Sequence, residues 1–254
     1  MSEFPSPAEH YDRFMGRYTV PLARALADEV GVKEGMRVLD VGCGPGSLTS
    51  ELAGRVGSEN VAAIDPAERF VAACQERNPG ADVRHGIGEE LPWEDDAFDA
   101  VLSCLVIAFM HDADDGLRQM KRVTKPGGMV GICMWDIAGG GMTMLRLFWN
   151  AMKTLRPDIE GEPPRAGTAE GDIAARMNRA GFRDVAGGAL EVSVDYSGFE
   201  DFWEPFNLAV GPSGQAFAKL ADEHKSEVRE AIRAELPNGR FTLDARSWYA
   251  TATA

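Results

Sequence analysis

Cysteine is scarce in this sequence and is not arranged for chemistry. Four cysteines occur in 254 residues, and no two of them form a Cys-x-x-Cys pair. A zinc site needs closely spaced ligands, and a disulfide framework is typical of small secreted chains. We therefore expect no metal site, and we interpret the cysteines as structural free thiols: Cys43, Cys74, Cys104 and Cys133.

Long apolar runs are missing as well. None reaches the roughly 20 residues that a membrane-spanning helix needs. The first residues, Met1–Pro5, contain an acid and a proline in place of the basic and apolar regions of a signal peptide. These features predict a cytoplasmic location and no membrane partner.

Basic charge is also in short supply. Lysine and arginine number 26 against 40 aspartates and glutamates, which gives a net charge of −14. A phosphate backbone would be repelled on average, and no dense Lys/Arg cluster offsets that repulsion. Nucleic acids are therefore not expected as partners, and a small-molecule substrate is. The sequence leaves the oligomeric state undefined.

What the sequence does have is an alternation of strand-like and helix-like segments. Strands are expected at 37–41, 61–64, 82–85, 98–103 and 129–135, with helices over 47–56, 67–76 and 114–123. The last of these helices stops at the breaker Lys125-Pro126-Gly127-Gly128. This βαβ pattern predicts a doubly wound, mostly parallel α/β sheet.

Beyond Trp135 the alternation breaks down. We expect helices over 142–155, 170–180 and 199–236, the last interrupted at 211–214, with a loop over 156–167 and strands at 189–195 and 241–253. The chain is interpreted as one domain over 1–254. Within it, an N-terminal helical segment covers 1–32, and helical insertions at 137–168 and 198–238 are candidates for a substrate cap.

A glycine-rich loop joins the first expected strand to its helix. Glycines at 42, 44 and 46 permit positive φ and let a ligand approach the backbone. Dinucleotide sites favour G-x-G-x-x-G, but here position 47 is Ser, and Asp40 would repel a pyrophosphate. Asp65 ends the second strand at the offset of a ribose-binding acid, although an Asp there could also be a helix N-cap. Together these features favour a nucleoside that bears an amino acid.

These motifs resemble those of the class I S-adenosylmethionine-dependent methyltransferases, especially the small-molecule branch similar to quinone-biosynthesis enzymes. The resemblance implies a seven-stranded Rossmann-like sheet with its last strand antiparallel, S-adenosylmethionine as cofactor and S-adenosylhomocysteine as product. His85–Trp93 resembles the adenine-side motif, but many relatives have an acid where Ile87 stands. The cofactor residues carried over to this sequence are Asp40, Gly42, Cys43, Gly44, Gly46, Ser47, Asp65, Pro66, Ile87, Gly88, Glu89, Ser103 and Cys104.

The segment from Tyr11 to Tyr18 resembles one that folds over the cofactor in relatives. Tyr11 and Arg17 could then bind the methionine carboxylate, since arginine is a bidentate partner for carboxylates. The alternative is an N-terminal helix with surface arginines.

Candidates for handling the acceptor follow the later strands. His111 lies near the carboxyl edge and could act as a general base, or it could simply begin a loop. Trp135, Asp136, Trp149 and Phe206 are expected to line an acceptor pocket, although aromatic residues also commonly pack a cap onto a sheet. We thus expect methyl transfer to a small molecule. A nicotinamide dehydrogenase and a non-catalytic S-adenosylmethionine-binding protein are the alternatives.

Overall fold

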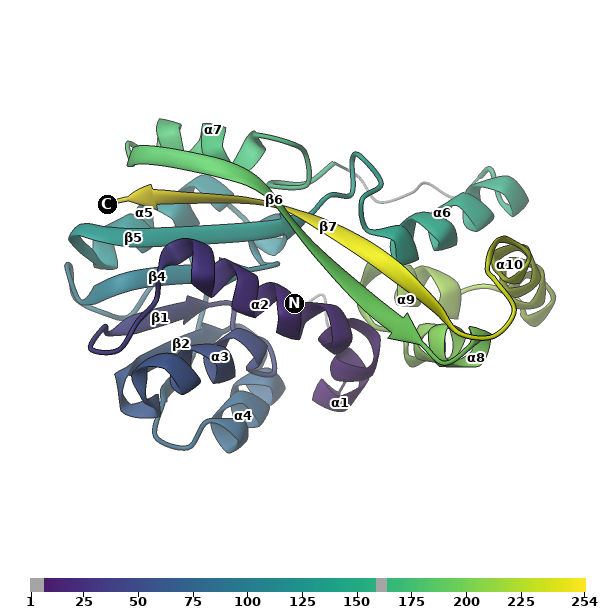
Figure 1. The fold of residues 1–254 in the computed structure, drawn as a ribbon, viewed down its shortest axis with the longest axis horizontal. Coiled ribbons are helices and arrows are strands. Elements are labelled where there is room, and N and C mark those ends of the chain that lie inside the picture. Colours follow the sequence, from purple (N-terminus) through teal and green to yellow (C-terminus); the bar gives the residue numbers. More distant parts are fainter. Residues whose placement is uncertain (1–6, 159–163) are drawn as a thin grey trace.

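The computed structural model describes residues 7–158 and 164–254. The predicted absence of a signal peptide at Met1–Pro5 and the middle of the loop predicted at 156–167 therefore lie outside the described residues. One seven-stranded sheet runs through the molecule in the order β3-β2-β1-β4-β5-β7-β6 (Figure 1). Its sequence-predicted class, a doubly wound and mostly parallel sheet, is confirmed.

Five strands of the sheet pair with one another in parallel: β1 (Val38–Val41), β2 (Val61–Asp65), β3 (Asp82–His85), β4 (Phe98–Cys104) and β5 (Thr124–Trp135). The strand β6 runs in the same direction as these five. The last strand, β7 (Phe241–Thr253), runs antiparallel to β5 and to β6 (Arg183–Tyr196). Every residue of β1 and β2 is buried, as expected for strands covered by helices on both faces. Because β1, β2 and β4 are parallel, their carboxyl ends meet at one edge of the sheet.

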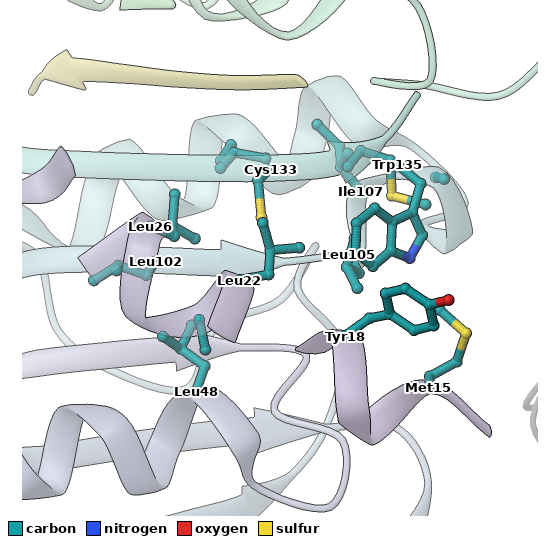
Figure 2. Packing of buried hydrophobic residues seen from close by; sticks show 14 of the residues in the cluster. Met15, Tyr18, Leu22, Leu26, Leu48, Leu102, Leu105, Ile107, Cys133 and Trp135 are labelled. Carbon is teal, nitrogen blue, oxygen red and sulfur yellow. The ribbon is translucent and has the colours of Figure 1, made fainter. Parts of the chain in front are cut away.

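Helices pack on both faces of the sheet. On one face α2 (Arg17–Val30) contacts α3 (Ser47–Val56), and α4 (Glu68–Arg77) packs on β2 and β3. On the other, α5 (Ala113–Val123) contacts α7 (Asp172–Arg179). Figure 2 shows Leu22 and Leu26 of α2 beside Leu102 of β4 and Cys133 of β5. This core fixes the strand ends from which the site is built.

A second group of helices lies at one end of the molecule, around the far ends of β6 and β7 (Figure 1). We call it the cap, and it consists of α6 (Thr143–Leu155), α8 (Phe199–Trp203), η4 (Glu204–Leu208), α9 (Gly211–Ala218) and α10 (Asp222–Glu235). Its centre is aromatic, with Phe206 stacked on Phe148 at 5.2 Å between ring centroids. The remaining helices are short: α1 (Ala8–Tyr11), the π-helix η1 (Asp12–Gly16), η2 (Ser58–Asn60) and η3 (Ile107–Phe109).

Three predicted boundaries differ from the structure, two of them because strand pairing overrides local signals. The breaker at 125–128 is a bulge inside β5, since Phe98 pairs with Thr124 and Ala100 with Met129. β6 begins at Arg183, where pairing with β7 holds two glycines in the strand. The segment 211–214 does not interrupt a helix; it opens α9, with proline in the first turn, where no amide hydrogen is needed.

Within the described residues, no helix has both the length and the apolar character required to cross a membrane.

Candidate active site

A cavity of about 350 Å³ opens over the carboxyl ends of β1, β2 and β4. This volume lies in the range of small-molecule sites. Most of the predicted cofactor residues line it, together with the predicted base: Tyr11, Asp40, Gly42, Cys43, Gly44, Ser47, Asp65, Pro66, Ile87, Gly88, Glu89, Cys104 and His111. Residues that are far apart in the sequence therefore meet at the edge that the strand order creates.

The glycine loop is shaped by backbone that other residues rarely adopt. Gly42 has a φ of 78°, and a Cβ there would lie 2.3 Å from a methyl carbon of Val106. Both Gly42 and Cys43 donate their backbone amides to the carbonyl of Ile64, which ties the loop to β2. Glycine at position 42 thus lets the loop after β1 pack directly against the loop after β4.

Asp65 is held rigidly at the end of β2. One carboxylate oxygen accepts from the amide of Gly44 at 2.9 Å, and the other accepts from Ala67 at 2.8 Å. Burial raises the pKa of Asp65, and these two hydrogen bonds oppose that rise. Two backbone amides, and no side-chain hydrogen bond, therefore hold the Asp65 carboxylate at the cavity.

Asp40 is the most deeply buried acid of the cavity, with 1% of its surface exposed. Its Oδ2 accepts from the Thr49 hydroxyl at 2.7 Å, whereas Oδ1 has no hydrogen-bond partner among the described residues. Burial raises the pKa of Asp40 to about 7. An unpartnered buried oxygen is costly, so a ligand that brings a hydrogen-bond donor, especially a cationic one, would be favoured at this point.

Another part of the cavity lining contains Ile87 and Glu89. The Glu89 Oε1 atom accepts from the backbone amide of His111 at 2.6 Å, which organises the loop after β4. Ile87 has 42% of its surface exposed, although a large apolar side chain would normally be buried. A flat ring of a ligand would cover it.

A smaller cavity of about 70 Å³ adjoins the first and shares Tyr11, Leu105 and Phe109 with it. The rest of its lining comes from the N-terminal helices, β5 and the loop after it, the loop before α7, and the cap region: Phe14, Met15, Met134, Trp135, Ile137, Leu145, Arg165, Thr168, Val210, Gly211, Pro212 and Ser213. The site therefore has two compartments, and Trp135 is the predicted acceptor residue that lines the smaller one. His111 lines only the larger compartment.

Three predicted cofactor residues lie outside both cavity linings. Arg17 forms an ion pair with Asp201 of the cap at 3.1 Å. The Ser103 hydroxyl donates to the carbonyl of Val41 at 2.9 Å. A Cβ at Gly46 would lie 3.1 Å from the sulfur of Cys74, so this glycine permits close packing of α4.

Three predicted acceptor residues also have other surroundings. Asp136 is buried and accepts from Arg246 at 2.6 Å and from the amide of Gly139 at 2.7 Å, which makes it an anchor for the loop after β5. Phe206 lies in the aromatic centre of the cap, and Trp149 packs edge-to-face on Phe148 at 5.1 Å. None of the three belongs to either lining.

Sequence reasoning did not single out Arg165, Phe109 or Leu105. Phe109 and Leu105 follow β4 in an apolar run that resembles any buried segment. Arg165 lies in a Pro- and Gly-rich stretch without periodicity, and only the folded chain brings it to Phe109, with its guanidinium 5.2 Å from the ring centroid. The segment from Tyr11 to Tyr18 was a usable signal, since Tyr11 lines both cavities and Phe14 lines the smaller one.

Comparison with known proteins finds a similarity in the central part of the chain. Residues 39–132 match the family model described as a methyltransferase domain. This part of the chain is therefore similar in sequence to methyltransferase domains. It contains the glycine loop, Asp40, Asp65 and the wall formed by Ile87 and Glu89.

Relatives that resemble this chain include proteins named for quinone biosynthesis. A demethylmenaquinone methyltransferase of Staphylococcus aureus is 35% identical over 140 residues, covering 52% of this chain and 57% of the relative. A ubiquinone/menaquinone biosynthesis C-methyltransferase of Idiomarina loihiensis is 38% identical over 125 residues, covering 46% and 47%. The chain thus spans about half the length of the curated relatives it matches.

The fold is shared more widely than the sequence. The solved structure of an S-adenosylmethionine-dependent methyltransferase from Aquifex aeolicus is 24% identical, with a TM-score of 0.50, and the match covers 67% of this chain and 83% of that chain. At this identity the likeness concerns the fold alone.

Proposed function

We propose that this protein binds S-adenosylmethionine in the larger cavity and methylates a small molecule held in the smaller one. The charge of the larger cavity carries the proposal. Its lining contains the carboxylates of Asp40, Asp65 and Glu89, and no lysine or arginine among the described residues. Such a lining suits a ligand with cationic groups and opposes a dinucleotide pyrophosphate.

The residues present fit the parts of that cofactor. Asp65 would accept hydrogen bonds from ribose hydroxyls, and the unpartnered Oδ1 of Asp40 would accept from the amino group. The exposed face of Ile87 would support the adenine ring. When bound, the cofactor supplies a methyl group attached to a positively charged sulfur.

The protein's contribution to the reaction is positioning and exclusion of water. Because Tyr11, Leu105 and Phe109 border both cavities, a donor and an acceptor would meet at these side chains. Holding two reactants in line can lower the activation barrier of a group transfer by several kcal/mol. Burial raises the pKa of Tyr11, so its phenol keeps its proton at neutral pH and can orient a ligand in that form.

Calorimetric titration with S-adenosylmethionine and S-adenosylhomocysteine tests the cofactor assignment. We expect micromolar binding of both and no binding of a reduced nicotinamide cofactor. Incubation with an acceptor panel that includes reduced demethylmenaquinone, the kind of acceptor named for the relatives, should then produce S-adenosylhomocysteine. Failure to bind either cofactor form would overturn the proposal, and binding without methyl consumption across the panel would restrict it to a binding role.

A further inference from the structure

The four cysteines of this chain are free thiols, and the fold arranges them in two contacting pairs. The sulfur atoms of Cys104 and Cys133 lie 3.5 Å apart, within hydrogen-bond distance for thiols. Cys43 and Cys74 form the second pair, through a hydrogen bond between their side chains. One member of each pair, Cys104 or Cys43, lines the larger cavity. Thiols that the sequence spreads over 91 positions, from 43 to 133, therefore meet two by two beside one cavity.

Strand pairing gives Cys104 and Cys133 the geometry that a disulfide needs. Cys104 is the last residue of β4, and its partner across the parallel ladder in β5 is Cys133. Neighbouring strands lie about 4.8 Å apart, and a disulfide spans about 4.4–6.8 Å between Cα atoms. The two side chains also point toward each other, since their sulfur atoms are in contact. A cross-link can therefore form here without a change in the strand register.

The backbone beside this pair leads directly to both cavities. The amide of Leu105 donates to the carbonyl of Cys133 at 2.9 Å, which ties the end of β4 to β5. Leu105 has a φ of 66°, in the left-handed region that a leucine rarely adopts, so the chain turns sharply after Cys104. Since Leu105 lines both compartments, the two thiols lie at the base of the segment that joins them.

The two sulfur atoms differ in their access to solvent. Cys104 is partly exposed and lines the larger cavity. Cys133 is fully buried and belongs to neither of the described linings. A hydroperoxide little larger than water can enter an empty cavity of about 350 Å³ and meets Cys104 first. A cofactor bound in the same cavity would cover Cys104 and block that approach.

We propose that Cys104 and Cys133 are a modification site, where a hydroperoxide forms a disulfide while the larger cavity is empty and a bound cofactor prevents it. The protection by the cofactor rests on the proposed function. With hydrogen peroxide, the Cys104 sulfur attacks one oxygen, the oxygen–oxygen bond breaks, and the other oxygen leaves as water with the thiol proton. The Cys133 sulfur then displaces the oxygen on Cys104 as a second water. The two sulfur atoms lose two electrons and two protons in total, and the peroxide takes up both.

The ionisation of Cys104 determines how fast this happens. The hydrogen bond between the two thiols and burial both raise the pKa of Cys104. Because the thiolate is the nucleophile, cross-linking should be slow at neutral pH and should accelerate as the pH rises.

Peptide mapping by mass spectrometry tests the site without turnover. Wild-type protein is treated with hydrogen peroxide, its remaining thiols are alkylated, and it is digested without reduction. We expect a peptide pair joined through Cys104 and Cys133 that dithiothreitol separates. S-adenosylhomocysteine at about ten times its dissociation constant should slow the appearance of this pair about tenfold, because the fraction of empty protein falls by that factor.

Three variants assign the sulfur atoms. Cys104→Ser should form no cross-link to Cys133. Cys133→Ala should stop Cys104 at the sulfenic acid, which dimedone captures. Cys74→Ser is the matched control, because it removes a buried cysteine outside both described linings and should cross-link as wild type does.

The outcomes separate the two proposals. Absence of the Cys104–Cys133 peptide pair, or a cross-link that joins Cys43 to Cys74 in its place, would overturn the modification site. Calorimetry with S-adenosylhomocysteine on the same samples tests the cofactor independently. Failure to bind it contradicts the proposed function and leaves the cross-link of the unliganded protein to be judged by mapping. Binding without any slowing of the cross-link contradicts the protection proposed here and leaves the cofactor assignment intact.

Discussion

At the scale of single residues, Asp40 makes cofactor binding depend on pH. Burial, and to a lesser extent the charge of Asp65, raise its pKa to about 7, while the hydrogen bond from Thr49 lowers it. A cationic ligand prefers the ionised form, so affinity for S-adenosylmethionine should fall about tenfold between pH 8 and pH 6. Titration calorimetry at both values measures this, and Asp40→Asn should flatten the profile. A pH-independent dissociation constant in wild type would contradict it.

The same shift affects the unliganded protein in the opposite sense. Because folding raises the pKa of Asp40, the protonated acid stabilises the folded state most fully below pH of about 4. That contribution is lost as the pH rises through about 7. Above neutral pH, a cationic ligand should restore part of the folding stability that the ionised Asp40 no longer provides. A thermal scan should show this as a higher unfolding midpoint when the ligand is present.

Asp65 provides a second residue-scale prediction. Replacing it with Asn keeps one oxygen to accept a backbone amide but removes the charged acceptor for ribose hydroxyls. Cofactor binding should weaken by roughly 1–3 kcal/mol. Asp222→Asn on the exposed surface of α10 is the matched control. An unchanged dissociation constant for Asp65→Asn would refute the ribose assignment.

At the scale of elements, the cap depends on its aromatic centre. Phe206 is fully buried, stacks on Phe148, and meets Phe14, a lining residue of the smaller cavity, at 5.1 Å between ring centroids. Phe206→Ala should cost about 3–5 kcal/mol in the free energy of unfolding, and Phe206→Leu should cost less because it leaves a smaller void. Denaturant unfolding gives both values. A loss below about 1 kcal/mol for the alanine variant would show that the cap is loosely packed.

The same scale shows what a sequence can predict. β1, α3, β2 and α4 agree closely with expectation because hydrophobic periodicity and a glycine loop are local signals. The glycine loop and Asp65 could be placed at the cavity for the same reason. Arg17 could not be placed, since its partner Asp201 lies 184 residues away in the sequence. Arg165 was missed because only the folded chain brings it to Phe109 and to the smaller cavity.

At the scale of the whole molecule, the excess of acidic residues determines which partners can approach. With a net charge of −14, the protein should show no binding to duplex DNA in a mobility-shift assay at low salt, where phosphate contacts are strongest. Retention of DNA under those conditions would reveal a basic surface that the overall charge conceals.

The two ends of the largest cap segment lie side by side. Tyr196 at the end of β6 pairs with Phe241 at the start of β7, so the chain leaves the sheet and returns to it at one place (Figure 1). The segment between them, which includes α8, η4, α9 and α10, is one continuous insertion that begins and ends at this residue pair. Such a segment can be exchanged as a unit: grafting another helical segment between these two residues would change the wall around the acceptor and leave the register of the sheet intact.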